Sequence, residues 1–176
     1  MLLVALSNLT ASIAAADLPA YLELTVNGQV IAGDSLAVET EDQIAVYAVS
    51  LPVFSTVSSG GAVRNPSSRP VTLLMDFDRS GSEILNAWAT GATVNSAVIS
   101  LYRATAGGGG ATENWATLTL SGGRISSYVL NSPDSLDPAV QGRPATLLVG
   151  LTYQSATLAE NASGQSRTIT WQTGGP

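Results

Sequence analysis

The chain has 176 residues, of which 7 are arginine and 13 are aspartate or glutamate, and it contains no lysine, histidine or cysteine. Without histidine and cysteine it has no imidazole base, thiolate nucleophile, Cys/His zinc site, haem ligand or disulfide. The net charge of −6 argues against a nucleic-acid partner and against a polybasic membrane-binding surface. A hydrophobic content of 45% is too high for a disordered chain, and the length suits one domain.

The charged fraction is unusually low. Only 11% of the residues are charged, whereas an ordinary soluble domain has about 25%. The surface must therefore be covered by small polar residues, or part of it is hidden against other copies of the chain. We expect the protein to associate with itself. The lack of cysteine is compatible with an extracellular protein.

Residues 1–16, MLLVALSNLTASIAAA, form an uncharged apolar segment that is too short and too polar for a transmembrane helix. We interpret it as an N-terminal arm that adds a strand or an apolar contact to a neighbouring subunit, with residues 17–176 as the folded domain. Two alternatives remain open: an uncleaved signal peptide and a strand that packs on its own domain. The arm residues expected at subunit contacts are Leu2, Leu3, Val4, Leu6, Leu9 and Ile13.

The first half of the domain has the pattern of strands. Residues 21–26 and 43–51 alternate in polarity, and Asn27-Gly28 after the first of these is a strong hairpin signal. Residues 55–70 are polar and rich in turn-forming residues, which predicts a long loop. Loops of this length are usually functional. Residues 71–77 then predict another strand.

One helix is expected, over residues 81–90. Ser80 and Glu83 have the spacing of a capping box, and Gly91 follows the last turn as a C-terminal cap would. Three residues at helical spacing form the apolar face: Ile84, Leu85 and Trp88.

The second half again predicts strands, over residues 93–102, 115–120, 125–130, 145–154 and 167–171. A turn at Gly122-Gly123 is expected to separate the second of these from the third. About eight strands with one short flanking helix in one domain predict an all-β barrel or sandwich.

The segment from Asp76 to Glu83 begins like a calcium-binding loop, with oxygen ligands at the first, third and fifth positions and glycine at the sixth. The acid required at the twelfth position would be residue 87, which is alanine. The alternative is that Asp76 and Asp78 end a strand and flank a helix N-terminus, where acidic residues are favourable. We predict no metal site.

No catalytic or cofactor site is expected. The acids Glu39, Glu41 and Asp42 lie in one polar turn, where a solvated loop is more plausible than a glycosidase pair. Serines are many, but no histidine or lysine is present to activate one. The tryptophans could form a sugar-binding platform, through Trp88, Trp115 and Trp171. A secreted monomeric β-sandwich that binds carbohydrate or a partner surface is therefore the alternative function.

The order of several short motifs resembles the haemolysin-coregulated protein (Hcp) family, the tube proteins of type VI secretion systems. The similarity starts with the strand and turn of residues 21–35 and the strand of residues 44–50. It continues with Asp78-Arg79-Ser80-Gly81-Ser82, the helix after it and the strand of residues 97–103. Residues 151–154 resemble a late strand of the family, so the resemblance covers about residues 20–172.

The resemblance implies a compact β-barrel whose copies form six-membered rings stacked into a hollow tube. In the family the long loop after the second strand contacts the next ring, which here is residues 53–70. It would contribute Val53, Phe54, Val57, Val63 and Arg64 to subunit contacts. The function would be assembly, either as an extracellular nanotube stabilised by the N-terminal arm or as the inner tube of a contractile injection system. The assembly would be secreted after a cytoplasmic stage, with room for small cargo in its lumen.

Overall fold

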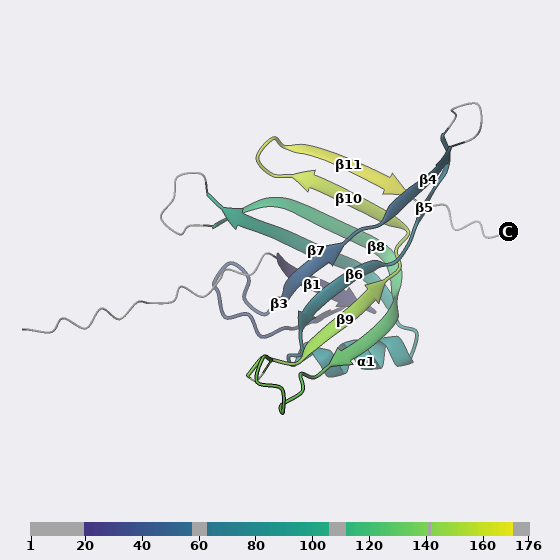
Figure 1. Cartoon of the computed structure of the whole chain (residues 1–176). Coiled ribbons are helices and arrows are strands. Elements are labelled where there is room, and N and C mark those ends of the chain that lie inside the picture. The colour runs from purple at the N-terminus through teal and green to yellow at the C-terminus, as the bar shows by residue number, and fades with distance from the viewer. Residues whose placement is uncertain (1–19, 58–62, 106–111, 141, 171–176) are drawn as a thin grey trace, which may run out of the picture.

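The computed structural model describes residues 20–57, 63–105, 112–140 and 142–170. These residues form eleven strands and one helix (Figure 1). The strands before the helix are β1 (Ala20–Val26), β2 (Gln29–Ile31), β3 (Ile44–Ser50), β4 (Val53–Val57), β5 (Val63–Ser68) and β6 (Val71–Asp76). The helix α1 (Ser80–Ala89) is followed by β7 (Thr93–Ala104), β8 (Thr112–Asn131), β9 (Thr146–Leu151), β10 (Ser155–Glu160) and β11 (Gln165–Thr170).

Six strands close into an antiparallel barrel in the order β8-β7-β1-β3-β6-β9, with β9 pairing back onto β8. The strands β10 and β11 extend the sheet beyond β8, and β2 forms a hairpin with β1. Closure removes most of the free strand edges that would otherwise pair with other chains. The prediction of an all-β barrel with one short helix is confirmed.

The strand β8 changes its pairing partner along its length. Its first half pairs with β10, and its second half pairs with β9. The predicted turn at Gly122-Gly123 is therefore wrong, because one continuous strand bends there. A Cβ on Gly123 would lie 2.6 Å from the carbonyl carbon of Thr152, so only glycine lets the two backbones approach this closely. The two glycines mark the bend where the strand passes from the extension into the barrel.

The core fills the barrel with aliphatic side chains from alternating strand positions. In β1, Ala20, Leu22, Leu24 and Val26 all point inward and are buried. Each fully buried leucine or valine contributes roughly 1.5–3 kcal/mol relative to an exposed one. The helix packs against β8 and β2 and inserts Ile84, which is completely buried.

The start of the helix differs from the predicted capping box. Ser80 is already helical, and its backbone N–H donates to Asp78 Oδ1 at 2.9 Å, so Asp78 rather than Ser80 provides the N-terminal acceptor. At the other end Gly91 has a φ of +62°, and the N–H of Ala92 donates to the carbonyl of Ala87 at 2.9 Å. The predicted glycine cap is confirmed, and the helix spans Ser80–Ala89 rather than residues 81–90.

The long loop predicted over residues 55–70 is largely a hairpin. The strands β4 and β5 pair in a separate two-stranded sheet, from Val53 opposite Ser68 to Val57 opposite Val63. Its second strand, VRNPSS, lacks the hydrophobic alternation that signals a strand, because this hairpin lies outside the barrel core. Figure 1 shows β4 and β5 projecting from the barrel.

Within the described part of the chain, no helix has the length and apolar character needed to cross a bilayer.

Candidate assembly surfaces

The projecting β4–β5 hairpin carries all the predicted loop contacts. Val53 and Phe54 are 42% and 48% exposed, and the Arg69 guanidinium lies 4.9 Å from the centre of the Phe54 ring. The backbones of Val57, Val63 and Arg64 lie in the same ladder, although their side chains are outside what the structure describes. The hairpin therefore presents large, half-exposed apolar groups away from the barrel core.

The predicted arm contacts, by contrast, lie outside the described residues, which begin at Ala20. They are Leu2, Leu3, Val4, Leu6, Leu9 and Ile13. Their role in subunit contacts stays a prediction.

A second exposed apolar surface lies on the connection between β2 and β3. Leu36 and Val38 are each 93% exposed on this connection. Sequence reasoning missed them because it considered only the acids of this turn. The available signal was two large aliphatic residues in an otherwise polar loop, where burial within the domain would not be expected.

Arg79 holds this connection against the start of the helix. Its Nε donates to the carbonyl oxygen of Gly33 at 2.6 Å and lies 3.2 Å from Asp34 Oδ1. Its terminal nitrogen forms an ion pair with Asp42. The N–H of Asp34 also donates to Asp78 Oδ2 at 3.1 Å. The exposed leucine and valine therefore stand on a loop that is tied to the domain at several points.

The acids of the calcium-like segment accept hydrogen bonds from the protein itself. The Tyr47 hydroxyl donates to Asp76 Oδ1 at 2.7 Å, and both oxygens of Asp78 accept backbone N–H groups. Burial, then the hydrogen bond and the charge of Asp76, raise the pKa of Tyr47 to about 12. Across the described residues, no group of three or more acids is placed to hold a metal ion. The arrangement supports the helix-flanking interpretation.

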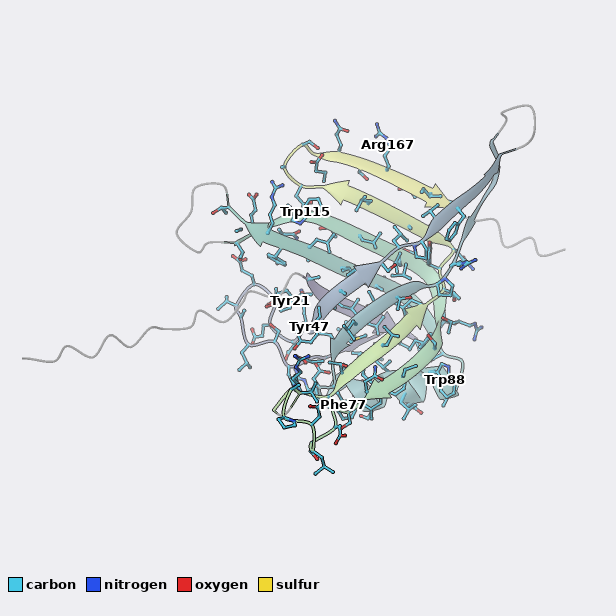
Figure 2. All side chains as sticks on the ribbon, viewed as in Figure 1. Tyr21, Tyr47, Phe77, Trp88, Trp115 and Arg167 are labelled. Atoms are coloured by element: carbon cyan, nitrogen blue, oxygen red, sulfur yellow. The ribbon has the colours of Figure 1, made fainter. Side chains whose placement is uncertain are left out.

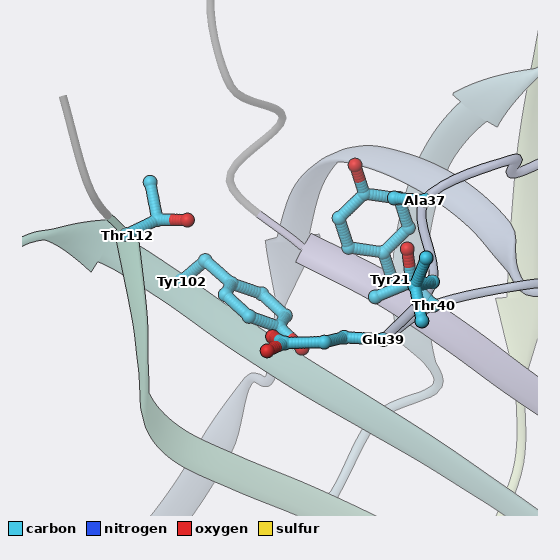
Figure 3. A pocket seen from close by; sticks show the side chains of 7 residues that line it. Tyr21, Ala37, Glu39, Thr40, Tyr102 and Thr112 are labelled. Atoms are coloured by element: carbon cyan, nitrogen blue, oxygen red, sulfur yellow. The ribbon is translucent and has the colours of Figure 1, made fainter.

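A small hollow of about 200 Å³ lies beside the β2–β3 connection (Figure 3). The rings of Tyr21 and Tyr102 meet edge to face there, with centroids 5.7 Å apart, and Glu39 lies beside Tyr102. Burial and the charge of Glu39 raise the pKa of Tyr102. The hollow thus presents two tyrosine rings and one carboxylate.

A larger hollow, of about 310 Å³, lies where the barrel meets its extension. Its walls are mainly aliphatic, with Leu51 following β3, Leu101 from β7 and Leu158 from β10, and with Trp115 beside them. Leu158 is 49% exposed. This hollow is called the β3–β7 groove below. Its mainly aliphatic lining suits an apolar segment.

The two tryptophans that the structure describes do not form one platform. Trp88 stands on α1 and Trp115 on β8, at opposite ends of the domain (Figure 2), and Trp171 lies outside the described residues. The Arg103 guanidinium lies 5.7 Å from the centre of the Trp115 ring. A guanidinium in this position competes with a sugar for the aromatic face.

Comparison with solved structures shows what this barrel is similar to. An Hcp protein has a TM-score of 0.79 and 21% identity, over 89% of this chain and 99% of the other. A double mutant of Hcp1 from E. coli EAEC 042 has a TM-score of 0.75 and 19% identity, over 88% and 99%. The secreted protein Hcp3 from Pseudomonas aeruginosa has a TM-score of 0.68 and 23% identity, over 88% and 100%.

A comparison with curated proteins found no match. A family model does match, over residues 21–160, which is most of the chain, and it is described as type VI secretion system effector, Hcp. The match and the shared barrel confirm the resemblance drawn from the motifs, and the chain belongs to the Hcp family of type VI secretion proteins.

Proposed function

We propose that this protein is a structural subunit that assembles into rings of six, and that the rings stack into a hollow tube secreted from the cell. The observation that carries the proposal is the β4–β5 hairpin, which extends from a closed barrel and exposes Val53 and Phe54. A closed barrel leaves few free edges for sheet-to-sheet association, so contacts between subunits would use such projections.

The low charge supports the same conclusion. With 11% charged residues and with Leu36 and Val38 exposed on the β2–β3 connection, an isolated monomer would present apolar surfaces to solvent. A ring closed by heterologous contacts would cover them, and stacking with a fixed rotation would generate an open filament. The role is structural, and it needs neither a cofactor nor a nucleic-acid partner.

Electron microscopy and size-exclusion chromatography of the full chain test the proposal. A ring of six would have a mass of about 108 kDa, from the 18.0 kDa of one chain. Phe54→Asp, which places a charge on the hairpin, should abolish tubes while leaving single rings. Leu136→Asp is the matched control, because Leu136 is 88% exposed in a different loop. Particles of 18 kDa alone would refute the proposal and favour a monomeric binding module.

We further propose that residues 1–16 form an arm that makes the tube durable outside the cell, with residues 17–176 as the domain. Deleting residues 1–16 should lower the temperature at which tubes disassemble. Unchanged tube length and heat resistance would refute this role for the arm.

A further inference from the structure

Two tyrosine rings line the small hollow beside the β2–β3 connection, which is called the tyrosine hollow below. Tyr21 comes from β1, and Tyr102 lies on the neighbouring strand β7. The two rings are nearly perpendicular, at 89°, and their centroids are 5.7 Å apart. They form an aromatic corner on one side of the hollow (Figure 3).

The sheet itself positions this corner. Along β7 the ladder with β8 skips one residue of β8, Trp115, just before it reaches Tyr102. A bulge of this kind re-aims the side chains beside it. Tyr21 lies within β1, which pairs with both β3 and β7. Both rings are therefore held by paired strands rather than by a free loop.

Glu39 adds a carboxylate to the tyrosine hollow from the β2–β3 connection. The next residue, Thr40, is only 3% exposed, and its hydroxyl is hydrogen-bonded to that of Ser35 at 2.8 Å. The N–H of Thr40 also donates to the carbonyl of Ala37 at 3.0 Å. Burial and then the charge of Glu39 raise the pKa of Tyr102, in keeping with a carboxylate beside that ring. The acid is thus fixed beside the aromatic corner.

The described residues that line the tyrosine hollow include no basic side chain. Arg103 follows Tyr102 in β7, but its Nε lies 2.8 Å from Glu113 Oε1, in an ion pair outside the hollow. Residues 1–19 and 106–111 contain no arginine or lysine. A cation that neutralises Glu39 within the hollow therefore comes from another molecule.

We propose that the aromatic corner and Glu39 bind an organic cation whose head group is a guanidinium or a methylated ammonium. Such cations are attracted to the faces of aromatic rings and are more weakly hydrated than a bare ammonium. The hollow of about 200 Å³ is several times the roughly 30 Å³ share of one water molecule, so it has room for a head group of this size. The net charge of −6 favours the approach of cations.

Two sources can supply this head group. One is a free molecule such as choline, and this case does not depend on the assembly proposed above. The other is an arginine of a neighbouring copy, which does depend on it. Arg143 and Arg167 are the candidates, because both are exposed and neither has an ion pair among the residues that the structure describes.

Ligand-observed NMR on the full chain tests the site with choline as the probe. The control probe is dimethylbutanol, in which carbon replaces the charged nitrogen of choline. We expect choline to bind with a Kd on the order of 1 mM, as befits a small ligand held by one charge and two rings. Dimethylbutanol should bind about tenfold more weakly, because it has the same shape without the charge.

Substitutions assign the binding to this hollow. Tyr102→Leu should weaken choline binding about tenfold, and Tyr102→Phe should recover most of that loss because it keeps a ring face. Glu39→Gln should weaken binding about fivefold. The matched control is Glu41→Gln, which removes the same charge from an exposed acid outside the hollow and should leave binding unchanged.

Equal binding of choline and dimethylbutanol overturns the inference, and so does binding that neither Tyr102→Leu nor Glu39→Gln weakens. A double variant, Arg143→Gln with Arg167→Gln, separates the two sources. Choline that binds the assembled double variant but not the assembled natural chain identifies a neighbour's arginine as the occupant, whereas equal binding identifies a free cation. No choline binding by either chain overturns the inference. Electron microscopy of the same samples reports ring formation separately, so failure of the proposed function is distinguishable from failure of this site.

Discussion

The bend in β8 gives the sharpest test of the fold, through Gly123→Ala. The new Cβ would lie 2.6 Å from the carbonyl carbon of Thr152 and 3.0 Å from the Cα of Tyr153, and both are backbone atoms. Side-chain rotation cannot relieve this overlap, so the turn between β9 and β10 must move away from β8. That turn is held by hydrogen bonds from the N–H of Thr152 to the carbonyl of Arg124 and from the N–H of Gln154 to that of Ser121, both at 2.9 Å.

Moving the turn also breaks a third bond, from the N–H of Arg124 to Thr152 Oγ1 at 3.0 Å. Because each hydrogen bond contributes about 1 kcal/mol net, the substitution should lower the free energy of unfolding by about 3 kcal/mol or more. For a domain of this size 3 kcal/mol lowers the melting temperature by roughly 6–12 °C. Thermal unfolding followed by circular dichroism at one fixed protein concentration measures the shift, because assembly makes the melting temperature depend on concentration.

Gly150→Ala is the matched control for Gly123→Ala. At Gly150 the new Cβ would meet the hydroxyl oxygens of Ser127 and Ser126, at 2.5 and 2.8 Å, and those side chains can rotate. We expect Gly150→Ala to lower the free energy of unfolding by about 1 kcal/mol, at the low end of the range for overpacked cores. If Gly123→Ala is as stable as the natural chain, or no worse than Gly150→Ala, the argument that close backbone contact requires glycine at this bend is refuted.

Three further predictions concern single side chains. Because the pKa of Tyr47 rises from 10.0 to about 12 on folding, the unfolded chain ionises first and the natural protein loses stability as the pH rises from 10 through 12. Tyr47→Phe should flatten this loss in urea titrations at several pH values, and an unchanged profile would contradict the assigned hydrogen bond to Asp76. Arg79→Ala should lower the free energy of unfolding by only about 1 kcal/mol, because the ion pairs of Arg79 are half-exposed. It should, however, speed amide hydrogen exchange in residues 32–43. Unchanged exchange would show that Arg79 does not hold this loop. Ile84→Ala should cost roughly 2–5 kcal/mol by leaving a cavity under α1, and a loss below 1 kcal/mol in urea denaturation would mean that the helix is not firmly packed.

The elements that the sequence predicts well are those with local signals. Asn27 and Gly28 both have positive φ values, as the turn type of a two-residue hairpin requires, so their order in the sequence is sufficient to place the turn. The helix is recovered to within one residue because its apolar spacing and Gly91 are local features. The strand β10 was missed because Ser-Ala-Thr-Leu-Ala-Glu has few bulky or branched residues and gains its order from pairing with β8.

The groove was beyond the reach of sequence reasoning for a different reason. Its walls come from β3, β7, β8 and β10, which are brought together by pairing between distant segments. The contacts of Val53 and Phe54 are expected only from the family resemblance, whereas the exposure of Leu36 and Val38 has a local signal, two large aliphatic residues in a polar loop. The local sequence shows which residues are apolar. Which of them stay exposed to solvent depends on how distant strands pair.

The pairing of β1 with β7 also has a consequence for synthesis on the ribosome. Ala20 lies opposite Leu101, so β1 lacks this partner until more than eighty further residues have been made. At about 5–20 residues per second this takes roughly 4–16 s. During this time the four inward-facing apolar residues of β1 lack β7, one of the two strands that flank β1 in the barrel. The nascent chain is therefore most vulnerable to aggregation early, and a stalled or slowly translated message should yield less soluble protein than one translated without pauses.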